Sequence, residues 1–112
     1  MSLLSDLNAL LSPLIPIETG VFSGAAPDRY AVVTPMNDSF ELFADNIPNG
    51  EIQEARISVY DKGAYTVIKN EIVRVLLSAN ITITDRRYIG YEDDTGYHHY
   101  AIDVVNNYEL ED

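Results

Sequence analysis

The sequence contains no cysteine in its 112 residues. Disulfide scaffolds, thiolate metal sites and thiol catalysis are therefore excluded. Basic residues are also scarce: seven lysines and arginines stand against eighteen aspartates and glutamates, which gives a formal net charge of -11. A surface that binds nucleic acid or an anionic membrane needs a positive field, so this composition argues against both kinds of partner.

A long hydrophobic run is also missing. No stretch approaches the roughly 18 apolar residues that a membrane-spanning helix requires. The first residues lack the basic and apolar regions of a signal peptide. Hydrophobic residues nevertheless make up 46% of the chain, which is enough for a packed core. Length and composition together predict one domain, residues 1–112, that crosses no membrane.

The most regular stretch is residues 51–91, which predicts a strand, a helix and a second strand. Apolar and polar residues alternate through 54–59, as in a half-buried strand. From residue 64 the apolar spacing becomes helical, and Asn80 is suited to the left-handed position that ends a helix. β-branched residues at 81–84 then favour a strand. The predicted apolar stripe of the helix consists of Tyr65, Ile68, Ile72, Val75, Leu76 and Ala79.

The segments before this stretch are shorter. A leucine-rich helix is predicted over residues 2–12, with a serine cap at its start and Pro13 at its end. Residues 13–27 are irregular, with a short edge strand expected at 21–22. Two further strands are predicted at 30–34 and 40–44, joined by a hairpin loop at 36–38. Residues 45–50, a turn-rich segment, then lead into the central strand.

The last part of the sequence predicts a hairpin. One strand runs over residues 81–91, a turn follows at 92–96, and a second strand returns over 97–108. The order of elements predicts an α+β fold with a mostly antiparallel (mixed) sheet of four to five strands. Two helices are expected to pack on one face of this sheet.

Candidate catalytic and metal motifs are weak. Asp94-Thr95-Gly96 spells the aspartic-protease triplet, but it follows two acidic residues in a predicted exposed turn, whereas the catalytic aspartates of such enzymes are buried. This acidic turn lacks the ligand spacing of a calcium loop. His98 and His99 are adjacent in a strand and point to opposite faces, which disfavours one shared metal ion. We therefore predict no enzyme activity, no metal site and no cofactor.

Eight tyrosines are many for this length, and four of them cluster on the last hairpin. Rigid amphipathic rings are favoured at protein interfaces, although tyrosine is also an ordinary strand residue. The sequence therefore predicts an oligomer or partner interface at Tyr88, Tyr91, Tyr97 and Tyr100.

Two segments, ARISVYDKGAY and RRYIGYEDDTGYHHYAIDVV, together with the helix between them, carry a family resemblance. The chain resembles the tail-terminator and tail-completion (head–tail joining) proteins of long-tailed bacteriophages. The leucine-rich first helix and APDRYAVV also fit that layout. The resemblance implies a structural protein that forms a ring, usually a homohexamer. Such a ring caps the tail tube, ends tube growth and meets the head connector protein.

The same resemblance implies a location at the tail–head junction of the virion, after assembly in the bacterial cytoplasm. DNA would pass through the ring without specific binding, and a negative lumen would repel its phosphates. The residues expected at that lumen are Asp38, Glu41, Asp45, Glu51 and Glu54. The alternative for the acidic residues is simple solubility.

Two other classes of function stay open from the sequence. One is a small acidic adaptor or immunity-type protein that binds a basic protein partner. The other is an enzyme with a hydrophobic cleft near Tyr88, Tyr97 and Tyr100, for which the sequence offers no clear acid–base pair.

Overall fold

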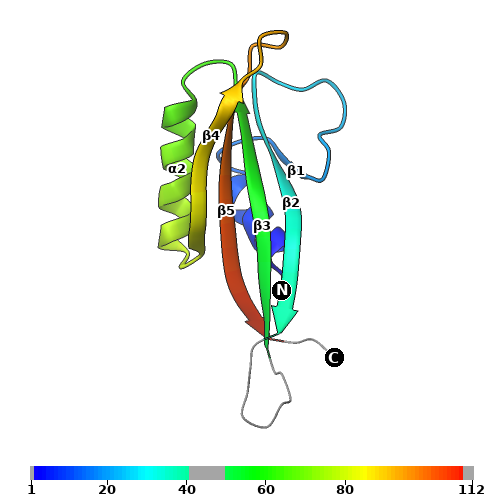
Figure 1. Cartoon of the computed structure of the whole chain (residues 1–112), viewed down its shortest axis with the longest axis vertical. Coiled ribbons are helices and arrows are strands. Elements are labelled where there is room, and N and C mark those ends of the chain that lie inside the picture. Colours follow the sequence, from blue (N-terminus) through cyan, green and yellow to red (C-terminus); the bar gives the residue numbers. More distant parts are fainter. Residues whose placement is uncertain (1, 41–49, 110–112) are drawn as a thin grey trace.

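The computed structural model describes residues 2–40 and 50–109 of the chain (Figure 1). Two helices and five strands are present in this part of the chain. Their bounds are α1 Leu3–Leu11, β1 Ile17–Thr19, β2 Arg29–Phe40, β3 Gly50–Asp61, α2 Tyr65–Ser78, β4 Thr82–Tyr91 and β5 His98–Glu109.

The five strands form one sheet in the order β1-β2-β3-β5-β4. All neighbouring pairs are antiparallel except β1 and β2, which are parallel, so the sheet is mixed. The last strand, β5, lies between β3 and β4, and α2 connects these two parallel-running strands across it (Figure 1). The predicted α+β class with a mostly antiparallel sheet is confirmed.

Both helices pack on the same face of the sheet. Side chains on that face come from alternate positions of β2, β3 and β5, as the period of a strand requires. Each helix contributes a stripe at four-residue spacing. The largest fully buried side chains of this core are Leu3, Leu7, Leu11, Ile15, Val33, Ile57, Val59, Ile68, Ile72, Leu76, Ile102 and Val104.

The helix ends have identifiable causes. Ser2 precedes α1 in an extended conformation, and its hydroxyl accepts a hydrogen bond from the Ser5 backbone N–H at 3.1 Å. Asn80 follows α2 with a φ of 61°, the left-handed conformation predicted for the residue that ends this helix. Both helices therefore begin and end within two residues of their predicted limits.

The predicted hairpin loop at residues 36–38 is wrong. β2 runs from Arg29 to Phe40 as one strand, and it pairs with β3 along this whole length. The register of β2 against β3 shifts between Pro35 and Asn37, so Met36 has no pairing partner and the strand bulges. Proline, which cannot donate a backbone hydrogen bond, is often found at such bulges. The strand predicted at 40–44 and the connection predicted at 45–50 lie largely outside the described residues.

The edge strand expected at residues 21–22 is also wrong. The short edge strand is β1, four residues earlier, and it pairs in parallel with β2 from Ile17 to Thr19. Val21 lies in the loop after β1 and is 81% exposed. Gly20 has a φ of 84°, a conformation that glycine adopts without strain, and it turns the chain out of the strand at this point.

Candidate interaction surfaces

The four tyrosines predicted at an interface are divided by the structure. Tyr88 and Tyr91 lie on β4 and are 44% and 53% exposed, whereas Tyr97 and Tyr100 are only 7% and 8% exposed. Tyr100 packs into the core beneath the helices, while Tyr97 packs against rings on the other face. Tyr88 and Tyr91 are therefore the members of this set that the folded chain presents to a partner.

Tyr97 belongs to an aromatic cluster that the sequence did not predict. Tyr30, Tyr60 and His99 are paired side by side across β2, β3 and β5, with ring centroids 4.8 Å and 4.4 Å apart. Tyr97 meets Tyr30 edge-on, and its hydroxyl donates a 2.6 Å hydrogen bond to the Pro27 carbonyl oxygen. The sequence shows only that aromatic residues occur in three of the strands. Whether these residues lie side by side depends on the register in which β2, β3 and β5 pair.

The face that carries this cluster is the open sheet face, defined by Tyr30 and Val32 of β2, Arg56 and Tyr60 of β3 and the residues paired with them. Among the described residues, no helix covers it, because α1 and α2 both pack on the opposite face. Figure 1 looks onto this face, with α1 behind the sheet. The loop after β1 packs against its aromatic end, where the Phe22 and Tyr30 rings lie 4.8 Å apart.

A charged row crosses the open sheet face beside the aromatic cluster. Arg56 of β3 binds Asp103 of β5 through two hydrogen bonds, of 2.7 Å and 3.1 Å. Asp85 of β4 is paired directly opposite Asp103 and forms an ion pair with Arg87. These hydrogen bonds, which Arg56 donates to the Asp103 carboxylate, raise the pKa of Arg56. The two carboxylates, Asp85 and Asp103, can face each other because each is paired with its own arginine.

His98 and His99 lie on opposite faces, as their adjacent strand positions predicted. His98 accompanies Tyr88 and Tyr91 on the helix side, with its Nδ1 atom 2.9 Å from the Tyr88 hydroxyl oxygen. His99 stacks on Tyr60 on the open sheet face, and its buried Nε2 atom has no hydrogen-bond partner among the described residues. Within residues 2–40 and 50–109, no group of three His, Cys, Asp or Glu side chains is arranged to hold a metal ion.

Lowering the pH through the histidine range should destabilise the protein through His99. Burial lowers the pKa of His99 below its usual value of 6.5, an effect that Glu92 opposes and Arg56 reinforces. The folded state therefore favours the neutral ring. The resulting stabilisation is present above pH 6.5 and is lost as the pH falls through the lowered pKa. Urea unfolding at a series of pH values would measure the loss.

The matched variant for this experiment is His99→Phe, which keeps a ring against Tyr60 but cannot be protonated. Its free energy of unfolding should depend less steeply on pH than that of the wild type between pH 7 and the lowered pKa of His99. Equal slopes in the two proteins would contradict the assignment.

The acidic turn at residues 92–96 is exposed, as predicted. Asp94 and its neighbours Glu92 and Asp93 all face solvent, and Gly96 has a φ of 85° that closes the hairpin. The Thr95 hydroxyl donates a 2.7 Å hydrogen bond to the Glu92 carboxylate. The Asp94-Thr95-Gly96 triplet thus lies in an exposed hairpin turn, far from the buried setting that a protease aspartate requires.

The residues predicted at an acidic lumen do not share one face. Asp38 and Glu51 occupy positions of β2 and β3 on the helix side, whereas Glu54 is on the open sheet face. All three lie in the half of the sheet away from the acidic turn. Glu41 and Asp45 lie outside the described residues. A role of these carboxylates at a lumen stays a prediction.

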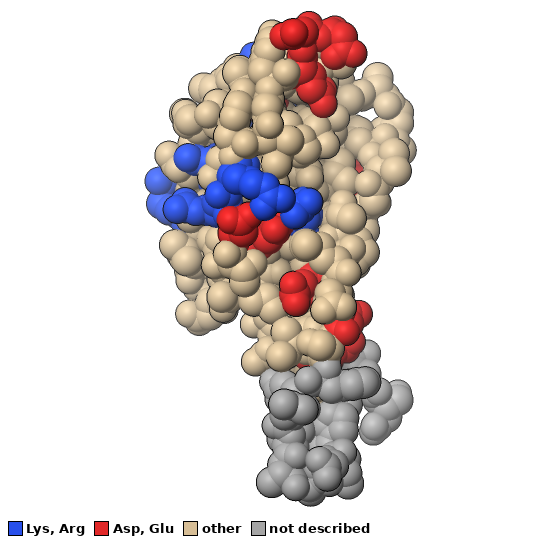
Figure 2. Space-filling model, viewed as in Figure 1, with Lys and Arg blue, Asp and Glu red and all other residues tan. Residues whose placement is uncertain are grey.

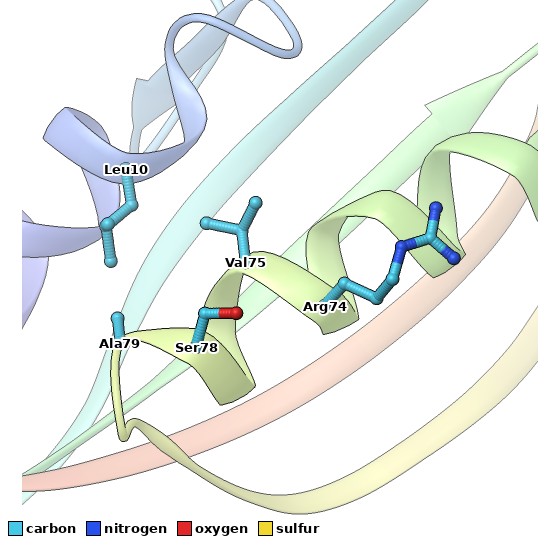
Figure 3. Close-up of a pocket in the computed structure, with 5 residues that line it drawn as sticks. All are labelled: Leu10, Arg74, Val75, Ser78 and Ala79. Carbon is cyan, nitrogen blue, oxygen red and sulfur yellow. The ribbon is translucent and has the colours of Figure 1, made fainter.

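The helix side carries an apolar groove between α1 and α2 (Figure 3). Val75 of α2 and Ala79, the residue just after α2, face Leu10 of α1 across it, and Arg74 extends along its rim. The groove has a volume of about 430 Å³, and a second hollow of about 310 Å³ adjoins it at Leu10 and Ala79. The chain therefore offers an apolar groove on one side of the sheet and, on the other, a face that no described helix covers.

No described helix is both long and apolar enough to cross a membrane. Comparison with known protein families gave no match to this sequence. Comparison with curated proteins gave no match either.

Proposed function

We propose that this protein is a tail-terminator or tail-completion protein of a long-tailed bacteriophage or prophage. In this proposal several copies, six in the usual case, form a ring on the last turn of the tail tube. The ring ends tube growth and provides the surface that the head connector protein meets. The resemblance of the two segments on either side of α2 is the source of the proposal.

The observation that carries the proposal is the pair of unlike surfaces on opposite sides of the sheet. A closed ring of identical subunits uses two different patches on each subunit, one for each neighbour. The open sheet face and the groove between α1 and α2 are two such patches, one on each side of the same sheet. The groove is apolar, while the open face combines aromatic rings with the Arg56–Asp103 pair.

The excess of acidic residues gives the proposed ring a second useful property. DNA must leave the head through the ring, so a surface that bound phosphate would slow its passage. A net charge of -11 per chain opposes such binding at any lumen that the subunits enclose. The proposal includes the prediction that part of one acidic set lines or borders this lumen: Asp38, Glu41, Asp45, Glu51 and Glu54.

Deleting the gene from a phage or prophage that encodes the protein should abolish infectious particles. Tail tubes should then grow past their normal length, and filled heads should accumulate without tails, because nothing caps the tube or meets the connector. Negative-stain images of the lysate and a plaque count would measure both effects. Added purified protein should bind one end of the isolated tubes and restore the joining of heads.

Normal tails and normal infectivity after the deletion would overturn the proposal. A stable one-to-one complex with a basic host or phage protein, together with normal tails, would instead identify an acidic adaptor. The wild-type protein supplied from a plasmid is the control that separates loss of the protein from damage to neighbouring genes.

A further inference from the structure

The end of β4 concentrates exposed apolar side chains at the edge of the sheet. Among the described strands, β4 is at the edge of the sheet and pairs only with β5. Seven large hydrophobic residues are exposed among those described, and three of them, Tyr88, Ile89 and Tyr91, fall within four positions of β4. Their exposed fractions are 44%, 48% and 53%. Aromatic and arginine side chains together are typical of the centre of a protein interface.

Opposite charges flank this apolar group along the chain. Arg86 and Arg87 precede it, and Glu92, Asp93 and Asp94 follow it in the hairpin turn. Figure 2 shows the two sets apart, with basic side chains in a band at mid-height and an acidic group at the hairpin end. Arg87 pairs with Asp85, but no ion pair among the described residues involves Arg86 or the three acidic side chains of the turn.

The segment from Arg86 to Asp94, which we name the β4 edge segment, is complementary to itself when reversed. If two copies lie antiparallel with their Gly90 residues opposite each other, the arginines of each copy face the acidic turn of the other. In this arrangement the arginine pair of each copy lies opposite the acidic residues of the other copy. The exposed apolar side chains of the two copies face each other between these charges. We propose that a second copy of the chain docks here, edge to edge about a two-fold axis near Gly90.

Neither the backbone conformation nor a close neighbour among the described residues requires glycine at position 90. Its φ is not in the positive range that favours glycine, and a Cβ atom added to it would meet nothing within 4 Å. A glycine inside a strand costs stability, and it often marks a bulge or a point where another backbone approaches closely. A register shift between Tyr88 and Gly90 marks a bulge here. An alanine would fit the single chain at this position but would widen the proposed contact at its centre.

The aromatic rings of the segment are already ordered in the single chain. The Tyr88 hydroxyl is 2.9 Å from His98 Nδ1, and the Tyr91 ring lies 4.9 Å from the His98 ring, centroid to centroid. Docking therefore fixes few additional side-chain rotamers, which reduces its entropic cost. The bulge interrupts the regular spacing of the edge, so side chains rather than a long backbone ladder carry the contact.

This contact is separate from the proposed tail function. A two-fold contact uses the same patch on both copies, whereas ring closure uses two different patches. The inference therefore stands or falls on the behaviour of the purified protein, whatever the result with tails.

The test is the mass of the protein in solution as a function of concentration, by sedimentation equilibrium. The wild type should be a dimer that dissociates on dilution. Arg86→Glu with Arg87→Glu should weaken the dimer by roughly tenfold or more, because the contact then brings like charges together. Asp93→Lys with Asp94→Lys should do the same. An equimolar mixture of the two variants should form a heterodimer, since each reversed patch then faces its complement.

Two more variants separate this contact from general charge effects. Gly90→Ala should weaken the dimer while leaving thermal unfolding of the monomer unchanged or slightly raised. Val67→Ala removes an exposed apolar side chain from α2 and should leave the dimer unchanged. A wild type that stays monomeric at every concentration would overturn the inference. A dimer that survives both charge reversals, or a mixture that does not associate, would overturn it as well.

Discussion

Replacing Ile57 by alanine should lower the free energy of unfolding by about 3–4 kcal/mol. Ile57 is in the middle of β3, the central strand, and is fully buried. It is paired directly with Val33 on one side and Ile102 on the other, both fully buried beneath the helices. Alanine at this position leaves a cavity that neighbours on three strands and two helices border. The surrounding side chains cannot relax far enough to fill this cavity, so most of the loss in free energy of unfolding remains.

A loss of this size is a large part of the roughly 5–15 kcal/mol that stabilises a typical domain. Urea unfolding followed by circular dichroism would measure it, with an unchanged slope showing that the folded state is intact. Val67→Ala is the matched control, because Val67 is 53% exposed on α2 and its loss should change stability by less than about 0.5 kcal/mol. Similar losses in the two variants would contradict the placement of Ile57 in the core.

Replacing Asp61 by alanine should cost roughly 2–4 kcal/mol, the second large effect that we expect. Asp61 ends β3, is 3% exposed and holds two donors. The Arg29 Nε atom donates a 2.8 Å hydrogen bond to one carboxylate oxygen, and the Gly63 backbone N–H donates a 2.7 Å bond to the other. One side chain thus joins β2 to β3 and fixes the turn that leads into α2. Removing it leaves both donors without their acceptor.

Two variants resolve the two parts of this effect. Asp61→Asn keeps an acceptor for the Gly63 N–H but removes the charge that faces Arg29, so its loss should be smaller than that of alanine. Asp28→Ala is the control, because Asp28 is 89% exposed in its side chain and its 3.8 Å pair with Lys62 lies at the surface. If Asp61→Ala were no more harmful than Asp28→Ala, the role of Asp61 would be wrong.

The local part of the fold could be predicted because it depends on spacing along the chain. The alternation around Ile57, the four-residue spacing of the buried side chains of α2 and the left-handed Asn80 are each set by residues close in sequence. The loop expected at residues 36–38 failed for the opposite reason. Asn and Asp favour turns locally, but pairing with the whole of β3 overrides that preference, and the strand continues to Phe40.

The surfaces were harder to predict than the elements. The opposite directions of His98 and His99 follow from strand geometry alone, and the structure agrees. The burial of Tyr97 depends on contacts with Tyr30 and Tyr60, which are distant in sequence and meet it only through the register of β2, β3 and β5. A pattern along one strand cannot reveal such contacts, so exposed and buried tyrosines looked alike in the sequence.

The position of β5 has a consequence for synthesis of the protein on the ribosome. β5 is the last strand in the chain, yet it lies between β3 and β4 and pairs with both along most of its length. While the nascent chain ends before residue 98, β4 has no strand partner and β3 has only β2, so the sheet face that packs against α2 is incomplete. Completion of the five-stranded sheet therefore waits until β5 has been synthesised and depends on contacts between distant residues, which slows folding.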